Sequence, residues 1–196
     1  MSADEGPVAP VETSRPTDDV AEDVTSPNRR VVYHFSEDGA IERFVPRPAP
    51  SDPAEPAGVR AVGPDHSPLY WFPRHCPRVS VWASTRSQRE VLQDRFGTDA
   101  LRICAVESSW LDRIRVCHLY RYEFDMAPFR PESQPGHFVA IEPVEPIARV
   151  RLDDLLGMHA AAGVELRLAP KLGHLVDLIL ASGLPYHLVR LRDIRR

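Results

Sequence analysis

Prolines are concentrated in one segment of this 196-residue chain. Nine of the 20 prolines fall between Pro46 and Pro77, a stretch we call the proline-rich segment. Each proline fixes φ at about −65° and lacks a backbone N–H, so helices and strands in this segment must be short. Residues 59–62 fit one short strand, and residues 69–72 (Leu-Tyr-Trp-Phe) form an apolar plug. Long irregular loops inside compact domains are usually functional or mobile, and we expect one or the other here.

The first 28 residues are a second unusual segment. They contain seven acidic residues and one arginine, so they carry −6, and the rest of the chain carries +2 of the total of −4. They contain no aromatic residue, and such a segment cannot bury enough apolar surface to offset the entropy lost on ordering. We expect a disordered acidic tail at residues 1–28, either a solubilising extension or a partner-docking segment. Residues 29–196 are expected to form a single α+β domain.

The remaining composition argues against several classes of protein. A body with a charge of +2 gives no electrostatic basis for nucleic-acid binding. Three cysteines are too few, and odd in number, for a disulfide framework. No signal peptide is visible, and no apolar run approaches the roughly 20 residues that span a bilayer. We therefore expect a cytoplasmic protein that does not use a membrane.

Hydrophobic patterning predicts the order of strands and helices. Strands are expected at residues 31–35, 59–62, 79–83, 101–106, 116–124, 137–141, 146–150, 164–168 and 186–191. Helical spacing and glycine stops predict helices at residues 87–96, 109–115, 152–162 and 172–182, and residues 41–45 fit a short strand or a helical turn. These elements predict an α+β fold in which helices flank a mixed, largely antiparallel sheet.

No short motif identifies a reaction. The glycines form no phosphate-binding loop, and G-x-S-x-G is absent. The His-Cys and Cys-His pairs at 75–76 and 117–118 lack zinc-site spacing, so no metal is expected. Cys76 lies between Arg74 and Arg78, which predicts the most reactive of the three thiols, although a structural role is the favoured interpretation.

The histidines and the aspartate pair at 153–154 allow structural interpretations. His34 lies near the end of the first strand, and it is either a structural histidine held by hydrogen bonds or a ligand-binding histidine. His159, His174 and His187 are interpreted as surface residues or as core residues whose ring nitrogens are hydrogen-bonded. The aspartates at 153–154 are expected in the first turn of a helix, where they complement the helix dipole.

Several segments occur in an order that resembles known families. They are residues 32–36 (VYHFS), 72–79 (FPRHCPRV), 119–124 (LYRYEF) and 137–144 (HFVAIEPV). Residues 31–193 as a whole resemble an uncharacterised bacterial family, a domain of unknown function. More distantly, residues 31–150 are similar to the rifampin ADP-ribosyltransferases, which open with an aromatic-Tyr-His strand that receives NAD and carry a later aromatic-x-x-x-Glu-Pro-Leu segment.

The second resemblance implies an ADP-ribosyltransferase-like core with NAD as cofactor. It implies that His34 holds the ribose of NAD. It also implies aromatic side chains against the nicotinamide, for which Trp71 and Tyr122 are candidates, with core packing as the alternative. Arg60 stands near the position of a stacking aromatic in that family, so Arg60 is also placed at the cofactor.

The same resemblance implies a catalytic carboxylate. Breaking the nicotinamide–ribose bond passes through an oxocarbenium-like cation, which a carboxylate stabilises. The aspartate expected after Phe129 is absent, and Glu132 and Glu142 are the candidates. Two functions stay open: an NAD-binding protein that transfers ADP-ribose to an unidentified acceptor, or a non-catalytic binding or adaptor protein that uses the proline-rich segment and the acidic tail. The partner is accordingly a small-molecule ligand or an unidentified protein.

Overall fold

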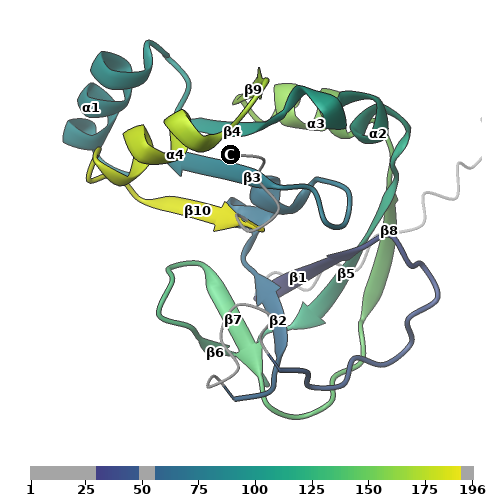
Figure 1. Cartoon of the computed structure of the whole chain (residues 1–196). Coiled ribbons are helices and arrows are strands. Elements are labelled where there is room, and N and C mark those ends of the chain that lie inside the picture. The colour runs from purple at the N-terminus through teal and green to yellow at the C-terminus, as the bar shows by residue number, and fades with distance from the viewer. Residues whose placement is uncertain (1–29, 49–55, 191–196) are drawn as a thin grey trace, which may run out of the picture.

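The computed structural model describes residues 30–48 and 56–190. The predicted tail at residues 1–28 lies outside this part of the chain, as does part of the proline-rich segment. The described residues form two β-sheets, with helices against the second one (Figure 1). The predicted α+β class is confirmed, as is the mostly antiparallel pairing of the strands.

The first sheet has six strands in the order β6-β7-β2-β1-β5-β8, all antiparallel. They are β1 (Val31–Ser36), β2 (Val59–Val62), β5 (Leu119–Asp125), β6 (Arg130–Pro131), β7 (His137–Ala140) and β8 (Ala148–Leu152). β5 pairs with β1 along the whole of β1, whereas the register of β1 with β2 holds a single pair, Tyr33 opposite Val62. β1 therefore leaves backbone groups of β2 available to side chains.

The second sheet has four strands in the order β10-β3-β4-β9. They are β3 (Arg78–Trp82), β4 (Arg102–Glu107), β9 (Val164–Ala169) and β10 (Tyr186–Val189). β4 and β9 run parallel, and the other pairs are antiparallel. The helical elements are the 3-10 turns η1 (Pro64–Tyr70) and η2 (Ser108–Trp110) and the helices α1 (Arg86–Phe96), α2 (Leu111–Val116), α3 (Leu155–Ala161) and α4 (Gly173–Leu180).

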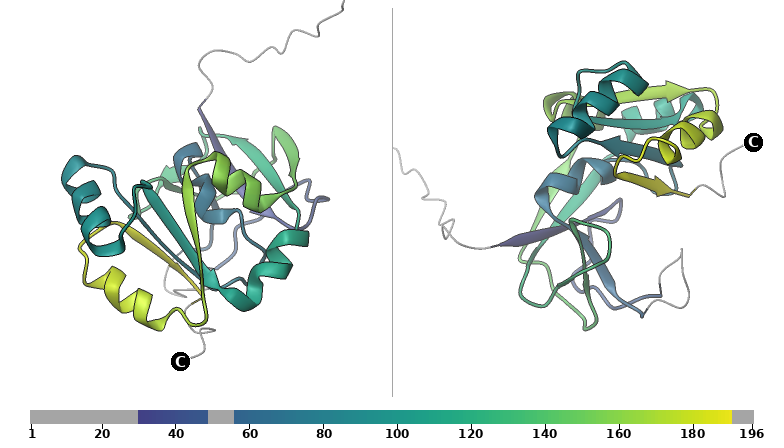
Figure 2. Two further views of the ribbon diagram at one scale, coloured as in Figure 1. Left: turned by 90° about the horizontal axis from the view of Figure 1, so that it is seen from above. Right: turned by 90° about the vertical axis from the view of Figure 1, so that its left-hand side faces the viewer.

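Alternating side chains of the second sheet form two cores. Val79 and Val81 lie in one buried cluster with Phe96 of α1 and Ile179 of α4. Trp82 and the alternate residues of β4 lie in another cluster, with side chains of η1, α2 and α3. This division follows from the period of two along a strand. The two further views separate the pair α1 and α4 from the pair α2 and α3 (Figure 2).

The division of the strands between two sheets differs from the single sheet that we expected. The apolar plug explains the difference, since Leu69 and Phe72 are buried in the core of the second sheet while β2, which precedes them, belongs to the first. A period-two pattern identifies a strand but not its partner strand. η1 and β6 were not predicted, because two-residue and proline-containing elements have no periodicity.

Helix starts follow local capping chemistry. Thr85 and Gln88 form a reciprocal capping box at the start of α1, and Gly97 ends that helix with φ 62°. The aspartates at 153–154 do not lie in the first turn of a helix as expected. Asp154 is instead the N-cap of α3, with its carboxylate accepting from Gly157 N. None of the helices in the described residues has the length and apolarity needed to cross a bilayer.

Candidate functional site

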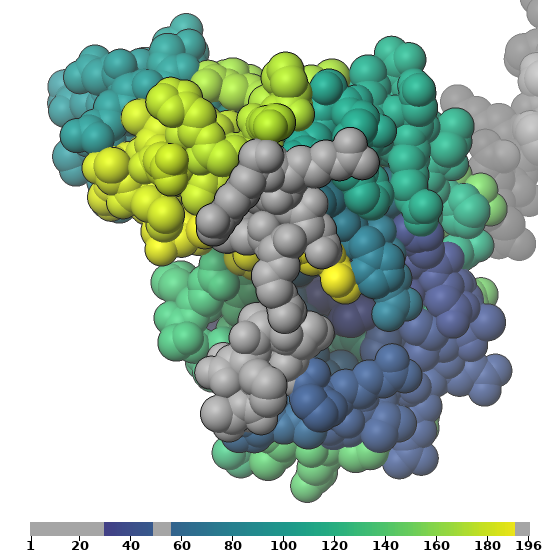
Figure 3. All heavy atoms as spheres, in the orientation of Figure 1, coloured from purple at the N-terminus to yellow at the C-terminus, as the bar shows by residue number. Residues whose placement is uncertain are grey.

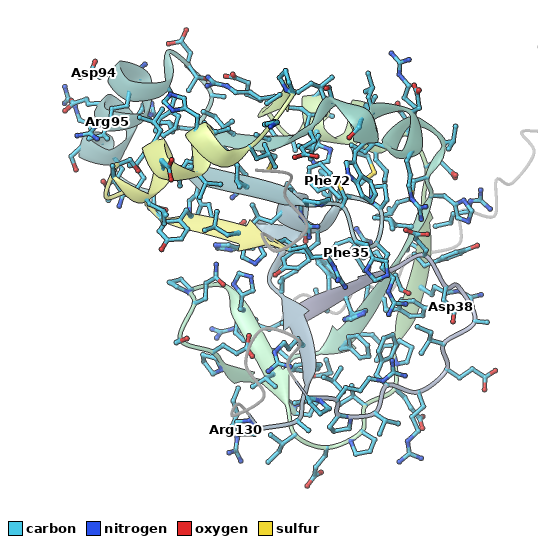
Figure 4. All side chains as sticks on the ribbon, in the orientation of Figure 1. Phe35, Asp38, Phe72, Asp94, Arg95 and Arg130 are labelled. Carbon is cyan, nitrogen blue, oxygen red and sulfur yellow. The ribbon has the colours of Figure 1, made fainter. Side chains whose placement is uncertain are left out.

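A cavity of about 480 Å³ lies where β10 of the second sheet meets β1, β2 and β7 of the first. In the space-filling view the first sheet occupies the lower half of the molecule and the second sheet, with its helices, the upper half (Figure 3). Aromatic side chains form part of the cavity wall, which includes Phe35 of β1 (Figure 4) and Tyr70 of η1. The two rings stack on each other at 6.5 Å between centroids. Volumes of 300–1,000 Å³, roughly, are usual for small-molecule sites.

His34 is one of the residues that line this cavity, and it lies on β1, whose register with β2 holds a single pair. Its Nδ1 lies 2.9 Å from the carbonyl oxygen of Arg60 on β2. A carbonyl only accepts, so Nδ1 carries the proton, and Nε2 of the neutral ring keeps a lone pair. Burial lowers the pKa of His34, which favours this neutral form. The ring is held by an edge-on contact with Phe44, at 5.0 Å between centroids.

An ion pair forms another part of the cavity wall. Nε of Arg60 lies 3.1 Å from a carboxylate oxygen of Glu132, and both side chains are partly exposed. Glu132 belongs to the turn between β6 and β7, where its N–H donates to the carbonyl of His137. Three of the six predicted site residues, His34, Arg60 and Glu132, therefore line one cavity.

The other three predicted site residues lie elsewhere. Val139 and Ile141 line the cavity, whereas the exposed Glu142, which lies past the end of β7, is not among its lining residues. Trp71 packs against His159, at 5.5 Å between ring centroids. Of the alternatives that the sequence left open, neither Trp71 nor Glu142 is among the residues that line this cavity.

Tyr122 is fully buried beside Phe44, as the core-packing alternative predicted. Its hydroxyl donates to the carbonyl of Asp38 at 2.8 Å and accepts from Ile41 N at 3.1 Å. This tyrosine anchors the turn after β1 and does not line the cavity.

The sequence did not predict a second polar part of the cavity, formed by Tyr70, His137 and His187, which we call the tyrosine–histidine wall. The Tyr70 hydroxyl lies 2.8 Å from Nε2 of His137 and 3.4 Å from Nε2 of His187. Because Nδ1 of His137 donates to the carbonyl of Pro135 at 3.1 Å, neutral His137 accepts from Tyr70 at Nε2. The Tyr70 oxygen then accepts from His187, whose Nδ1 is buried without a hydrogen-bond partner in the described residues.

Burial also explains the protonation states along this wall. It is the largest cause that lowers the pKa of His137 and of His187, the latter to about 3. The positive charge of Arg78 is the second cause at His187. Burial raises the pKa of Tyr70 to about 12. His187 was interpreted as a surface or satisfied group, and no sequence signal links it to residues 50 or more positions away.

Cys76 differs from its expected role as the reactive thiol. It is fully buried, and burial raises the pKa of its thiol to about 12. Arg78 donates to the carbonyls of Leu69 and Cys76.

The described residues contain no group of three histidine, cysteine or acidic side chains placed to hold a metal ion.

We expect Cys117 to be the first thiol alkylated in the folded protein. It is only half-buried, and burial raises its pKa to about 11, below that of Cys76. Brief treatment with iodoacetamide followed by peptide mapping should show one labelled cysteine, and labelling in denaturant should show all three. Labelling of Cys76 or Cys104 before Cys117 would contradict this order.

Comparison with known proteins identifies the family. No curated protein and no solved structure matches the chain. The model of one family, described as a family of unknown function (DUF6886), matches residues 33–194, which include every residue of the cavity wall described above. The chain therefore belongs to DUF6886, a family of unknown function.

Proposed function

We propose that the cavity binds NAD and that the chain is an ADP-ribosyltransferase-like protein with an unidentified acceptor. The observation that carries the proposal is the convergence of His34, Arg60 and Glu132 on one cavity. These residues come from β1, β2 and the β6–β7 turn; His34 stands at the position that the rifampin ADP-ribosyltransferase resemblance implies, and Arg60 and Glu132 lie near the other two positions. The cavity also joins aromatic walls to a few polar groups, which is typical of nucleotide-sized ligands.

The side chains have distinct roles in this proposal. Nε2 of His34 accepts a hydrogen bond from a ribose hydroxyl, because Nδ1 is already committed to the carbonyl of Arg60. Tyr70 and Phe35 line the cavity and supply the aromatic wall against which the nicotinamide packs. The carboxylate of Glu132 stabilises the positive charge that develops on the ribose as the bond to nicotinamide breaks and its electron pair leaves with nicotinamide.

Ligand-induced stabilisation tests the binding step. A ligand that binds only the folded state at about 100 times its Kd adds about 2.7 kcal/mol to the free energy of unfolding. We expect NAD and ADP-ribose to raise the melting temperature of the wild type and not that of His34→Ala. His174→Ala changes an exposed histidine on α4 and is the control that should retain the shift. Absence of a shift in the wild type would contradict the proposal.

Replacing each candidate carboxylate in turn by a neutral amide tests catalysis. Glu132→Gln should lower the rate of nicotinamide release by about 10²–10³-fold, because a neutral amide cannot stabilise the cation. Glu142→Gln is the matched control, since Glu142 is exposed and lies outside the cavity, and it should leave the rate unchanged. The readout is nicotinamide released from NAD, measured by chromatography. Equal losses in both variants would contradict the assignment of Glu132.

A non-catalytic binding protein on the same fold is the second candidate. The ion pair between Arg60 and Glu132 favours it, because the carboxylate is engaged by a cation at 3.1 Å. This candidate predicts stabilisation by NAD without any release of nicotinamide, in the wild type as well as in Glu132→Gln.

A further inference from the structure

The tyrosine–histidine wall brings polar side chains from both sheets to the cavity. Tyr70 comes from η1, His137 from β7 and His187 from β10. Ring centroids of the two histidines are 5.3 Å apart, and each lies within 5.8 Å of the Tyr70 ring. Three polar side chains from distant parts of the chain thus share one small region of the cavity.

The charges around this wall are unequally distributed. Arg78, on β3 behind the wall, is buried, and its guanidinium lies 5.6 Å from the centre of the Tyr70 ring. It donates to backbone carbonyls, and no ion pair joins it to a described carboxylate. Glu132, the carboxylate that lines the cavity, is paired with Arg60. A buried cation without a paired carboxylate makes the potential at the wall positive.

The unpaired nitrogen of His187 is the second observation. Its Nδ1 is buried and lacks a partner among the described residues, a costly arrangement for a polar atom. Its charged and titratable neighbours are Arg78, His137 and His66, and it contacts Tyr70. Besides burial, the charge of Arg190 contributes to lowering the pKa of Arg78, and the charge of Glu132 contributes to raising the pKa of Tyr70. A ligand that brings negative charge would let His187 take up a proton and donate from Nδ1.

We infer that the tyrosine–histidine wall is an oxyanion subsite, in which His187 binds a phosphate group of the ligand while Tyr70 and His137 hold the His187 ring in place. The inference rests on the proposed function only for the identity of that ligand, in which the group is the diphosphate of NAD. Binding is linked to proton uptake, since the bound anion offsets the positive potential and converts the Nδ1 lone pair of His187 into a donor. A charge-assisted hydrogen bond of this kind is stronger than a neutral one.

Calorimetric titration of the full chain with inorganic pyrophosphate tests the inference. We expect binding at about pH 6 to be about tenfold or more tighter than at about pH 7.5, because the bound anion raises the pKa of His187 from its low value in the free protein back towards the ordinary range of histidine. Titrations in two buffers of different ionisation enthalpy should show net proton uptake by the protein. His187→Phe should weaken binding at about pH 6 by about tenfold and remove most of the pH dependence.

Two further variants keep the outcome interpretable. Tyr70→Phe removes one hydroxyl and keeps the ring, so it should also weaken pyrophosphate binding, and it serves if His187→Phe does not fold. His174→Gln, on the exposed face of α4, should bind as the wild type does. Absence of pyrophosphate binding at about pH 6, or binding that neither variant alters, would overturn the inference.

The outcome is separable from that of the proposed function. Stabilisation by ADP-ribose that is independent of pH and unaffected by His187→Phe would remove the oxyanion subsite and leave the proposed function standing. Binding of pyrophosphate with proton uptake, in a protein that neither NAD nor ADP-ribose stabilises, would establish the subsite and remove the proposed function.

Discussion

Replacing Phe44 by alanine should lower the free energy of unfolding by about 3–5 kcal/mol, the usual loss for a large aromatic residue in a core. The Phe44 side chain is 8% exposed and makes edge-on ring contacts with Tyr122 and Phe124, at 5.0 and 5.1 Å between centroids. It also supports the His34 ring. Denaturant titration should therefore show the loss of stability, and the folded variant should bind NAD more weakly.

The neighbouring residue provides the control for this prediction. Val45 is 56% exposed, and Val45→Ala should change the free energy of unfolding by less than about 0.5 kcal/mol. The backbone bridge of Phe44 with Val144, at 2.8 and 3.0 Å, does not depend on either side chain. A similar loss in both variants would mean that the segment is held by its backbone and not by the Phe44 ring.

Acidification below about pH 6.5 should destabilise the fold, because burial lowers the pKa of His34 and of His187. Both histidines are neutral in the folded and unfolded states at higher pH, so the free energy of unfolding does not change with pH there on their account. Below about pH 6.5 the unfolded chain binds their protons first, and stability is lost as the pH falls, for His187 towards its pKa of about 3. For His187 the loss approaches about 1.4 kcal/mol per pH unit once the unfolded histidine is fully protonated, and His34 adds to the loss in the same direction.

Denaturant titrations across this pH range test the prediction. His187→Phe should reduce the pH dependence, and it should not destabilise the protein at about pH 7.5, because it removes a buried nitrogen without a described partner. His174→Gln, at an exposed position, should keep the wild-type dependence. A stability that is constant between about pH 7 and 5 would show that neither His34 nor His187 is held neutral by the fold.

Local sequence patterns predicted the strands better than their arrangement. β2 was predicted with its observed bounds and β1 to within one residue, because β-branched and aromatic residues end there at turn residues. The partition of the strands into two sheets depends on η1 and on non-local pairing, which have no signature in a single sequence. Cys76 illustrates the same limit, since arginines adjacent in sequence do not keep its thiol near solvent.

The site could be predicted only where a segment has a recognisable order of residues. His34 lies in such a segment and Glu132 lies near one, and both share the cavity with Arg60. The tyrosine–histidine wall comes from three segments that meet only through the tertiary fold, so the sequence could not indicate it. Tyr122 faces the same side of the first sheet as His34, directly opposite it in register, yet Phe44 and the turn after β1 cover its ring.

A crystal structure of the protein grown with ADP-ribose tests the central claim most directly. We predict that ADP-ribose occupies the cavity between the two sheets, with a ribose hydroxyl within hydrogen-bond distance of Nε2 of His34, while Nδ1 keeps its bond to the Arg60 carbonyl. Binding of ADP-ribose elsewhere on the surface, or an empty cavity at a saturating concentration, would contradict the claim that this cavity is the nucleotide site.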